Sequence, residues 1–288
     1  MKHANEKGNV HKRYSHIPGR VVQLESLVIV KLGGSVITHK DSSPPRFNDE
    51  HLGRIARELT NHDGPLIVVL GGGAHGHQAA HKHGFGSPAT PSQQLLAGIP
   101  DIRHNMSVLA LRVEEEMNKQ GVPGVVFSPF TFVTLRNNHI EHFPTSIIKR
   151  TLNAGLSAII HGDVCFDVNK SASILSGDTI AVHLAERLAA RAVFIGTNVD
   201  GVLEENPARN PAARCIPLID SSNKNRILAG IGPSSSTDVT GGMARKISEL
   251  LQLSDRNIEV AIFNLLRPGR LTALLSGNPT TCTRLRLS

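Results

Sequence analysis

Three lysines in this sequence occupy positions that phosphate chemistry would require. Lys31 lies inside an apolar stretch, and Lys40 follows a glycine turn nine residues later in the chain. Lys246 comes shortly after the pair Gly241-Gly242. Phosphoryl transfer depends on positioning and on positive charge around the transferring group more than on covalent help. A lysine inside an apolar strand also needs a partner anion, which makes Lys31 the strongest single candidate.

Two glycine turns each follow a short apolar run that is typical of a buried strand. The first turn, Gly33-Gly34-Ser35, follows Leu27–Leu32, and the second, Gly71-Gly72-Gly73, follows Leu66–Leu70. Glycine lets backbone amides approach a ligand closely, and a helix N-terminus beyond the turn favours an anion. One such turn is as readily a plain strand–helix connection, but two predict phosphate-binding turns that face each other. Neither matches the P-loop or the Rossmann pattern.

Two aspartates and several histidines each allow a functional and a plain structural interpretation. Asp178 and Asp200 can position a nucleotide, a lysine or Mg²⁺, or they can cap a helix and a turn. His77 follows the second glycine turn, where it can donate to a bound phosphate. The spacing of His77 and His81 would also suit a metal. No carboxylate or cysteine stands beside them, so we expect no metal site and expect His81 and His83 at the surface.

The elements that must position these residues alternate between strands and helices. This pattern predicts an α/β fold, a three-layer αβα sandwich with a mainly parallel open sheet. The expected strands are 27–32, 66–70, 122–127, 157–161, 192–196, 258–263 and 281–287. The expected helices are 48–61, 74–83, 102–120, 144–154, 176–190, 268–276 and one opened by Gly241-Gly242. We further expect a hairpin around Asn137-Asn138 and a long loop over 84–101. Ligands of such sheets gather at the carboxyl ends of the strands.

The composition excludes several classes of function. Five basic residues and one acidic residue fall within 1–20, so this segment carries +4 of the net charge of +7. It belongs to a leader, 1–26, that we expect to be flexible. With one Tyr and no Trp, the chain lacks the stacking surfaces that single-stranded nucleic acid requires. No apolar run reaches membrane-spanning length, and the leader lacks a secretory apolar segment. Three cysteines without a CxxC pair favour a reducing compartment. We therefore expect a cytoplasmic protein without nucleic-acid or membrane partners.

Six ordered motifs resemble the amino acid kinase superfamily and, within it, the isopentenyl phosphate kinase branch. They are KLGGSVITHK (31–40), LGGGAHGH (70–77), HGDVCFD (161–167), LSGDTIA (175–181), GTNVDGV (196–202) and TDVTGGMARKI (237–247). The resemblance covers 27–288 as one kinase domain, with an acceptor-binding lobe at about 27–170 and a nucleotide-binding lobe at about 171–288. Two positions depart from the family pattern: His75 stands where an aromatic residue is usual, and Asn198 where aspartate is common.

The resemblance implies a reaction of ATP with isopentenyl phosphate that gives ADP and isopentenyl diphosphate, with Mg²⁺ and in a homodimer. It implies catalytic roles for Lys31, Lys40 and His77. The implied nucleotide-binding residues are Lys31, Gly33, Gly34, Ser35, Gly73, Asp178, Thr197, Asp200, Gly241, Gly242 and Lys246. The implied acceptor-binding residues are Gly72, Gly73, His77 and Gly162. From their place after the second glycine turn, we expect Phe85, Ile99, Ile102 and Met106 to line a pocket for the acceptor tail.

Two other functions are compatible with the same motifs. A fosfomycin-type kinase, or another small phosphonate or phosphate kinase, shares the glycine–histidine pattern and the acceptor charge but needs no long apolar pocket. The second alternative is a nucleotide-binding protein that keeps the fold and has lost turnover. Asn198 weakly favours this interpretation. The retained residues argue against it; they are Lys31, Lys40, His77 and Lys246.

Overall fold

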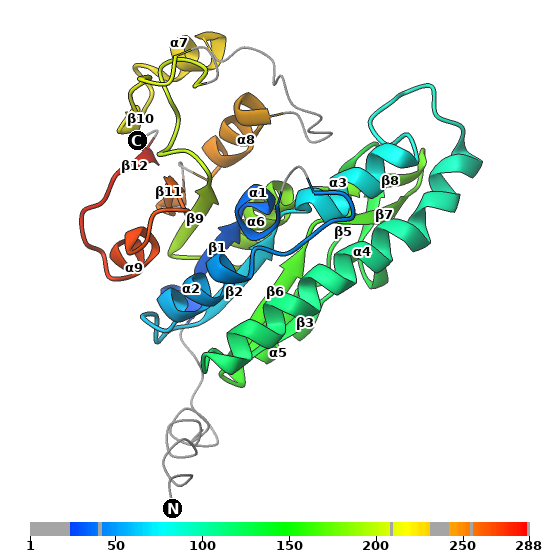
Figure 1. Ribbon diagram of the computed structural model, residues 1–288, viewed down its shortest axis with the longest axis horizontal. Coiled ribbons are helices and arrows are strands. Elements are labelled where there is room, and N and C mark those ends of the chain that lie inside the picture. Colours follow the sequence, from blue (N-terminus) through cyan, green and yellow to red (C-terminus); the bar gives the residue numbers. More distant parts are fainter. Residues whose placement is uncertain (1–23, 40–41, 208–209, 231–241, 254–255, 287–288) are drawn as a thin grey trace, which may run out of the picture.

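The computed structural model describes residues 24–39, 42–207, 210–230, 242–253 and 256–286. The expected leader therefore lies almost entirely outside the described residues. The centre of the molecule is an eight-stranded sheet (Figure 1). Its strands, in spatial order, are β10 (Leu218–Ile219), β12 (Cys282–Leu285), β11 (Glu259–Asn264), β9 (Ala192–Thr197), β1 (Val28–Leu32), β2 (Leu66–Leu70), β6 (Ser157–His161) and β3 (Gly124–Phe127). Neighbours are parallel except β11 and β12.

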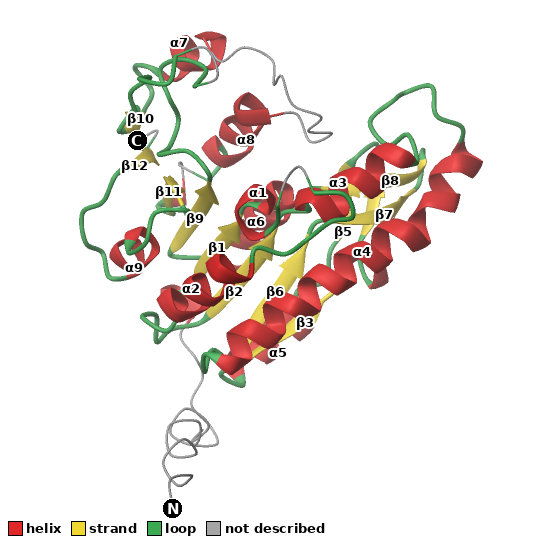
Figure 2. Ribbon diagram, viewed as in Figure 1, coloured by secondary structure: helices red, strands yellow, loops and turns green. Residues whose placement is uncertain are grey.

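Helices cover both faces of this sheet (Figure 2). One core cluster packs against α1 (Gly34–Ile37), α2 (Asp49–Leu59), α3 (Gly73–Lys82), α4 (Ser92–Lys119) and α9 (Arg270–Leu275). The other packs against α5 (Ser146–Asn153), α6 (Gly177–Leu188), α7 (Lys224–Gly230) and α8 (Gly242–Leu251). Two short 3₁₀ turns are η1 (Leu24–Ser26) and η2 (Pro129–Thr131). None of the described helices combines the length and the apolarity needed to cross a membrane. The predicted three-layer α/β fold is confirmed.

The central strands are largely apolar because each face contributes to a different core, and the buried Lys31 in β1 is a charged exception. Along β1, Val28 and Val30 belong to the first core cluster, whereas Ile29 belongs to the second. Most expected elements are found with ends that shift by a few residues. The predicted N-cap of α2 is also confirmed, since the side chain of Asn48 accepts a hydrogen bond from the His51 amide at 3.4 Å.

A second sheet that the sequence pattern only partly predicted lies beside the first. It contains β5 (His139–His142), β4 (Thr134–Arg136), β7 (Asp163–Asp167) and β8 (Ser171–Leu175). The hairpin between β4 and β5 is confirmed: Asn137 and Asn138 both have positive φ, 53° and 66°, as a type I′ turn requires. The β7–β8 pair was missed because buried acids interrupt its apolar pattern. Asp167 accepts backbone hydrogen bonds from both turn asparagines.

The expectation of a loop over 84–101 was wrong in its second half. Helix α4 begins at Ser92 and includes Pro100, a residue that normally ends a helix. Tertiary packing overrides that preference, because Leu95 and Ile99 pack against the core. Gly98 is needed there: a Cβ on it would lie 2.7 Å from the Cβ of His83. The sequence predicts a loop here because glycine and proline usually interrupt helices.

Candidate active site

The register of the sheet brings the two glycine turns to the same level. Leu32 pairs with Leu70 on one side and with Gly196 on the other. The chain therefore leaves β1, β2 and β9 at neighbouring points of the carboxyl edge, where parallel α/β sheets bind ligands. Figure 1 shows α1, α3 and α6 gathered at this edge.

The two turns touch backbone to backbone, so the expectation that they face each other is confirmed, and phosphate binding by them stays a prediction. A Cβ on Gly34 would lie 2.1 Å from the backbone nitrogen of Gly73, and one on Gly71 would lie 2.8 Å from that of Gly34. A Cβ on Gly33 would lie 2.6 Å from the carbonyl oxygen of Gly196. Gly73 also has a φ of +52°, a conformation that glycine adopts readily. Side chains at these positions would force the turns apart, so glycine is required by close approach.

Thr38 joins the two turns through one hydroxyl, a role that the sequence analysis missed. Its Oγ1 donates to the carbonyl of Gly34 at 2.8 Å and accepts from the amide of Ala74 at 3.0 Å. The residue is almost fully buried, with 1% exposed. Its place within the first motif was the available signal, but the partner on α3 is 36 residues away. Ser35 is exposed in the first turn of α1.

Lys31, Asp178 and Lys246 form one ion cluster beside the first glycine turn. The Lys31 Nζ lies 2.5 Å from Asp178 Oδ1, and the Lys246 Nζ lies 2.6 Å from Asp178 Oδ2. Asp178 is the second residue of α6, and Ser176 caps that helix by accepting from the Thr179 amide. The structure thus supplies the partner anion that Lys31 requires. The sequence allowed Asp178 to position a nucleotide, a lysine or Mg²⁺, and the structure shows that it pairs with two lysines.

Burial and the neighbouring charges change the pKa values of the residues in this cluster. Burial lowers the pKa of Lys31 to about 8, although attraction to Asp178 opposes that effect, and Lys246 adds to the lowering. Burial alone would raise the pKa of Asp178, but the two lysines, Lys31 before Lys246, hold it well below its usual range. The aspartate is therefore ionised at neutral pH, and the cluster as a whole carries positive charge. Its two ammonium groups are held at fixed positions, as electrostatic stabilisation of a phosphoryl group demands.

A second pair of ionised groups, Asp200 and Arg270, holds the loop after β9, and the end of that strand approaches Gly33 of the first turn. Asp200 Oδ1 accepts from Asn264 Nδ2 at 3.0 Å and from Arg270 Nη1 at 2.8 Å. These bonds, Asn264 first, lower the pKa of Asp200. Thr197 donates to the carbonyl of Val199 at 2.9 Å. The loop after β9 is thereby tied to β11 and α9. Arg270 and Asn264 were not predicted, because only the sheet order places them here.

The residues assigned to the acceptor lie around the second glycine turn. The Gly162 amide donates to the Leu70 carbonyl at 2.9 Å, so the end of β6 lies beside this turn. His77 is half-buried on α3, about one helical turn beyond Gly73. A Cβ on Gly72 would lie 3.7 Å from the Sδ of Met106. Helix α4 therefore packs directly on the turn that would hold the acceptor phosphate.

The expected tail-pocket residues lie together in the core. Phe85, Ile102 and Met106 are 5%, 2% and 1% exposed, and Ile99 packs against them. They share a core cluster, and Met106 within it lies against the second glycine turn. Their role in binding an acceptor tail stays a prediction. Lys40 and Gly241 lie outside the described residues, and Gly242 is the first residue of α8.

The four histidines of α3 and its end have separate environments. His75 is buried and stacks on Phe47, with ring centroids 4.7 Å apart and planes 10° apart. It thus takes an aromatic role at the position where the family has an aromatic residue. His81 is exposed, whereas the Nε2 of His83 lies 3.0 Å from Asp101 and is not at the open surface. Among the described residues, no group of three potential ligands gathers around a metal position.

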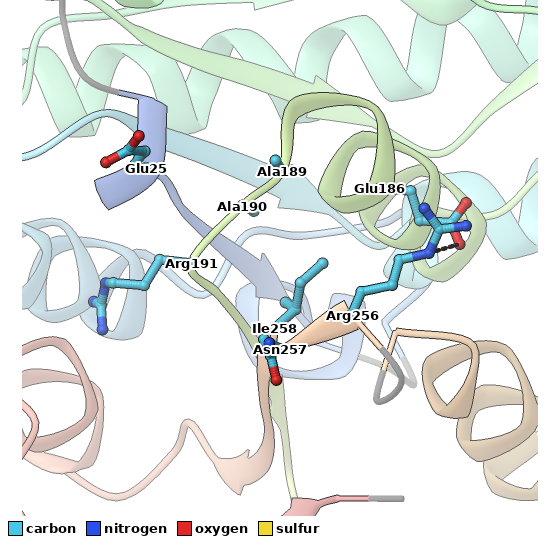
Figure 3. A pocket seen from close by; sticks show the side chains of 8 residues that line it. All are labelled: Glu25, Glu186, Ala189, Ala190, Arg191, Arg256, Asn257 and Ile258. Atoms are coloured by element: carbon cyan, nitrogen blue, oxygen red, sulfur yellow. Dashed lines mark ion pairs between the residues drawn. The ribbon is translucent and has the colours of Figure 1, made fainter. Parts of the chain in front are cut away.

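A pocket of about 430 Å³ lies elsewhere on the molecule (Figure 3). It is lined by Glu25, Glu186, Ala189, Ala190, Arg191, Arg256, Asn257 and Ile258. Arg256 and Glu186 pair with each other at 3.5 Å. Glu25 precedes β1 and the other lining residues precede β9 or β11, at the amino edge of the sheet, so this pocket is separate from the glycine turns.

Comparisons with known proteins agree with this geometry. The sequence pattern of the Amino acid kinase family matches residues 26–264. An isopentenyl phosphate kinase of Methanothermobacter thermautotrophicus is 35% identical over 265 residues, which cover 90% of this chain and 98% of that relative. One of Methanocaldococcus jannaschii is 34% identical, over 77% of this chain and 85% of the relative.

A solved structure of an isopentenyl phosphate kinase also superposes on this chain. It gives a TM-score of 0.78 at 32% sequence identity and covers 90% of this chain and 99% of the solved one. Sequence and fold therefore agree over nearly the whole length of both proteins. This chain belongs to the amino acid kinase family, and the isopentenyl phosphate kinases are among its relatives.

Proposed function

We propose that this protein phosphorylates isopentenyl phosphate with ATP, giving ADP and isopentenyl diphosphate. The observation that carries the proposal is the contact between two glycine turns, with the lysine cluster on one side and Gly72, Gly73 and His77 on the other. Two phosphate groups bound at these turns would meet at the carboxyl edge of the sheet. The relatives named isopentenyl phosphate kinase supply the acceptor identity.

Each side of the site has its own task in this proposal. Lys31, Lys246 and the first glycine turn would bind the phosphates of ATP, and Lys40 would neutralise the transferring group. Amides of the second turn and His77 would hold the acceptor phosphate. An acceptor oxygen would attack the γ-phosphorus, and the bond from that phosphorus to the β-phosphate oxygen would break. The protein would contribute position and charge, which is what phosphoryl transfer needs.

Mg²⁺ enters the proposal as part of the Mg·ATP substrate. The carboxylate of Asp178 is engaged by Lys31 and Lys246, and that of Asp200 by Arg270. Neither is free to form a protein-only metal cage. Mg²⁺ commonly keeps several waters and takes substrate phosphates as ligands, so the nucleotide itself would supply them.

A homodimer and a cytoplasmic location belong to the same proposal. Val108 and Leu111 of α4 are 39% and 57% exposed, and residues three apart lie on one side of a helix. This apolar pair supports contact with a second copy, which light scattering in solution would test. The acceptor lobe, 27–170, and the nucleotide lobe, 171–288, likewise remain proposals.

Turnover with different acceptors tests the function. ATP consumption should require isopentenyl phosphate and should yield isopentenyl diphosphate as the phosphorylated product. Consumption with fosfomycin in place of isopentenyl phosphate would favour the phosphonate kinase reading. Nucleotide binding without turnover on either acceptor would favour the hypothesis of a nucleotide-binding protein that has lost catalytic activity.

The charge of Lys31 predicts a pH dependence. Its folded-state pKa of about 8 means that the ammonium loses its proton as the pH rises through that value. We expect kcat/KM for ATP, which reports the free enzyme, to fall above about pH 8. In a Lys31→Arg variant the guanidinium stays charged, so the fall should move to higher pH. The measurement is kcat/KM from about pH 6 to pH 10, each profile relative to its own maximum. Superimposable profiles would exclude Lys31 as the titrating group.

The buried cluster beside the second turn predicts chain-length selectivity. Met106→Ala or Ile102→Ala should admit longer isoprenyl phosphates, because each additional buried CH₂ contributes about 0.8 kcal/mol. We expect kcat/KM for geranyl phosphate, relative to isopentenyl phosphate, to rise by about tenfold or more. Val113→Ala, on the same helix and also buried, is the matched control for loss of core volume. An unchanged preference in both test variants would place the tail pocket elsewhere.

A further inference from the structure

A buried carboxylate lies one residue beyond Gly162 and gathers three segments of the chain. The side chain of Asp163 is 0% exposed, and its Oδ2 accepts from Arg103 Nη1 at 2.8 Å. The same oxygen accepts from the Ser128 hydroxyl at 3.1 Å and from the Phe130 amide at 3.3 Å. Oδ1 accepts from the Val164 amide at 3.0 Å. The carboxylate thus joins β7 to α4 and to the segment around η2.

The guanidinium of Arg103 is fixed from several directions. Its carbon lies 4.9 Å from the centre of the Phe130 ring, and the same Nη1 that reaches Asp163 also donates to Ser128. Arginine suits such a site because its planar group can pair with a carboxylate and lie over an aromatic ring together. Its side chain is 22% exposed. The orientation of α4 at this point is therefore tied to Asp163.

Both ends of this link reach the acceptor side of the site. Gly162 donates to the carbonyl of Leu70, the last residue before the second glycine turn. A Cβ on Gly162 would lie only 3.3 Å from the amide nitrogen of Gly177, at the start of α6. On α4, Arg103 follows Ile102 directly. Met106 lies about one helical turn beyond Arg103 and packs against the second glycine turn. The link therefore spans the phosphate end and the tail end of the proposed acceptor site.

A buried ion pair of this kind is weak evidence for a role in stability. Apolar residues of similar volume are often equally stabilising at such sites, whereas removal of one partner is costly. What the pair does fix is geometry, since Asp163 Oδ2 accepts from three donors on two other segments and Oδ1 accepts from the Val164 amide. We propose that Arg103 and Asp163 are positioning residues that set the distance between the acceptor-phosphate turn and the tail-binding face of α4. This inference rests on the proposed function and assigns these residues an effect on the acceptor alone.

Steady-state kinetics of Arg103→Met and Asp163→Asn test the inference. Small displacements of a bound substrate are costly, so we expect kcat/KM for isopentenyl phosphate to fall by about 10- to 100-fold. KM for ATP should change by less than about twofold, and the relative preference for longer isoprenyl phosphates should change. Arg103→Lys, which keeps the charge without the planar group, should recover part of the loss. Neither a KM nor a ratio between two acceptors depends on the fraction of folded enzyme.

Arg112→Met is the matched control, because Arg112 lies on the same helix, is 25% exposed and pairs with Asp49 at 2.9 Å. It should leave the acceptor preference unchanged. If Arg103→Met fails to fold, Ser128→Ala offers a milder test, because it removes one neutral donor to Asp163. This variant should also lower kcat/KM for isopentenyl phosphate. Equal losses for both substrates with an unchanged acceptor preference would overturn the inference. Absence of turnover in the unaltered protein would overturn the proposed function, and the inference with it.

Discussion

Replacement of His77 by alanine is expected to lower kcat for phosphoryl transfer by on the order of 10³-fold, with little change in KM for ATP. The acceptor monophosphate carries close to two negative charges at neutral pH, and ATP carries more. The amides of the second glycine turn supply dipoles but no net charge. A donor on α3, one turn beyond Gly73, would orient an acceptor oxygen towards the γ-phosphorus, and a nearby dianion would favour the imidazolium.

His77→Asn and His77→Gln should retain part of the activity because an amide can still donate a hydrogen bond. His81→Ala is the control, since His81 lies one turn further along α3 and is exposed. Its rate should stay close to that of the unaltered protein. A normal kcat/KM for isopentenyl phosphate in His77→Ala would remove His77 from the mechanism. It would also weaken the assignment of the second turn to the acceptor.

Replacement of Lys40 by alanine is expected to lower kcat by about 10²–10³-fold, with a much smaller effect on KM for the acceptor. Lys40 follows the first glycine turn and stands two residues after Thr38, whose hydroxyl joins the two turns. A charge in this part of the chain would matter most as the γ-phosphoryl group leaves ADP, when it stabilises the transition state more than the bound ground state.

Arg46→Ala is the matched control for Lys40, because Arg46 is an exposed basic residue in the same connection between α1 and α2. Loss of general positive charge alone would affect both variants alike. A rise in KM with an unchanged kcat for Lys40→Ala would mean that the lysine only binds ground-state phosphate. In that case the stabilising charges would be those of Lys31 and Lys246.

Local signals predicted much of the fold and the outline of the site. Apolar β-branched runs followed by glycines identified β1 and β2 with their turns, because strand burial and close backbone approach leave a mark on neighbouring residues. Asn48 and the pair Asn137-Asn138 were likewise readable, since a helix cap and a type I′ turn depend on residues a few positions apart. Local reasoning failed at Pro100, where core packing outweighs the tendency of proline to end a helix.

Only the tertiary structure decided which of the candidate residues meet. Lys31 and Asp178 are 147 residues apart in the chain, and they pair because α6 packs on the face of β1 from which Lys31 projects. Arg103 and Asp163, 60 residues apart, gave no sequence signal, because a buried acid and an arginine on a helix are each unremarkable alone. Strand order, register and helix packing determine such contacts, and those depend on burial of the whole core rather than on any one segment.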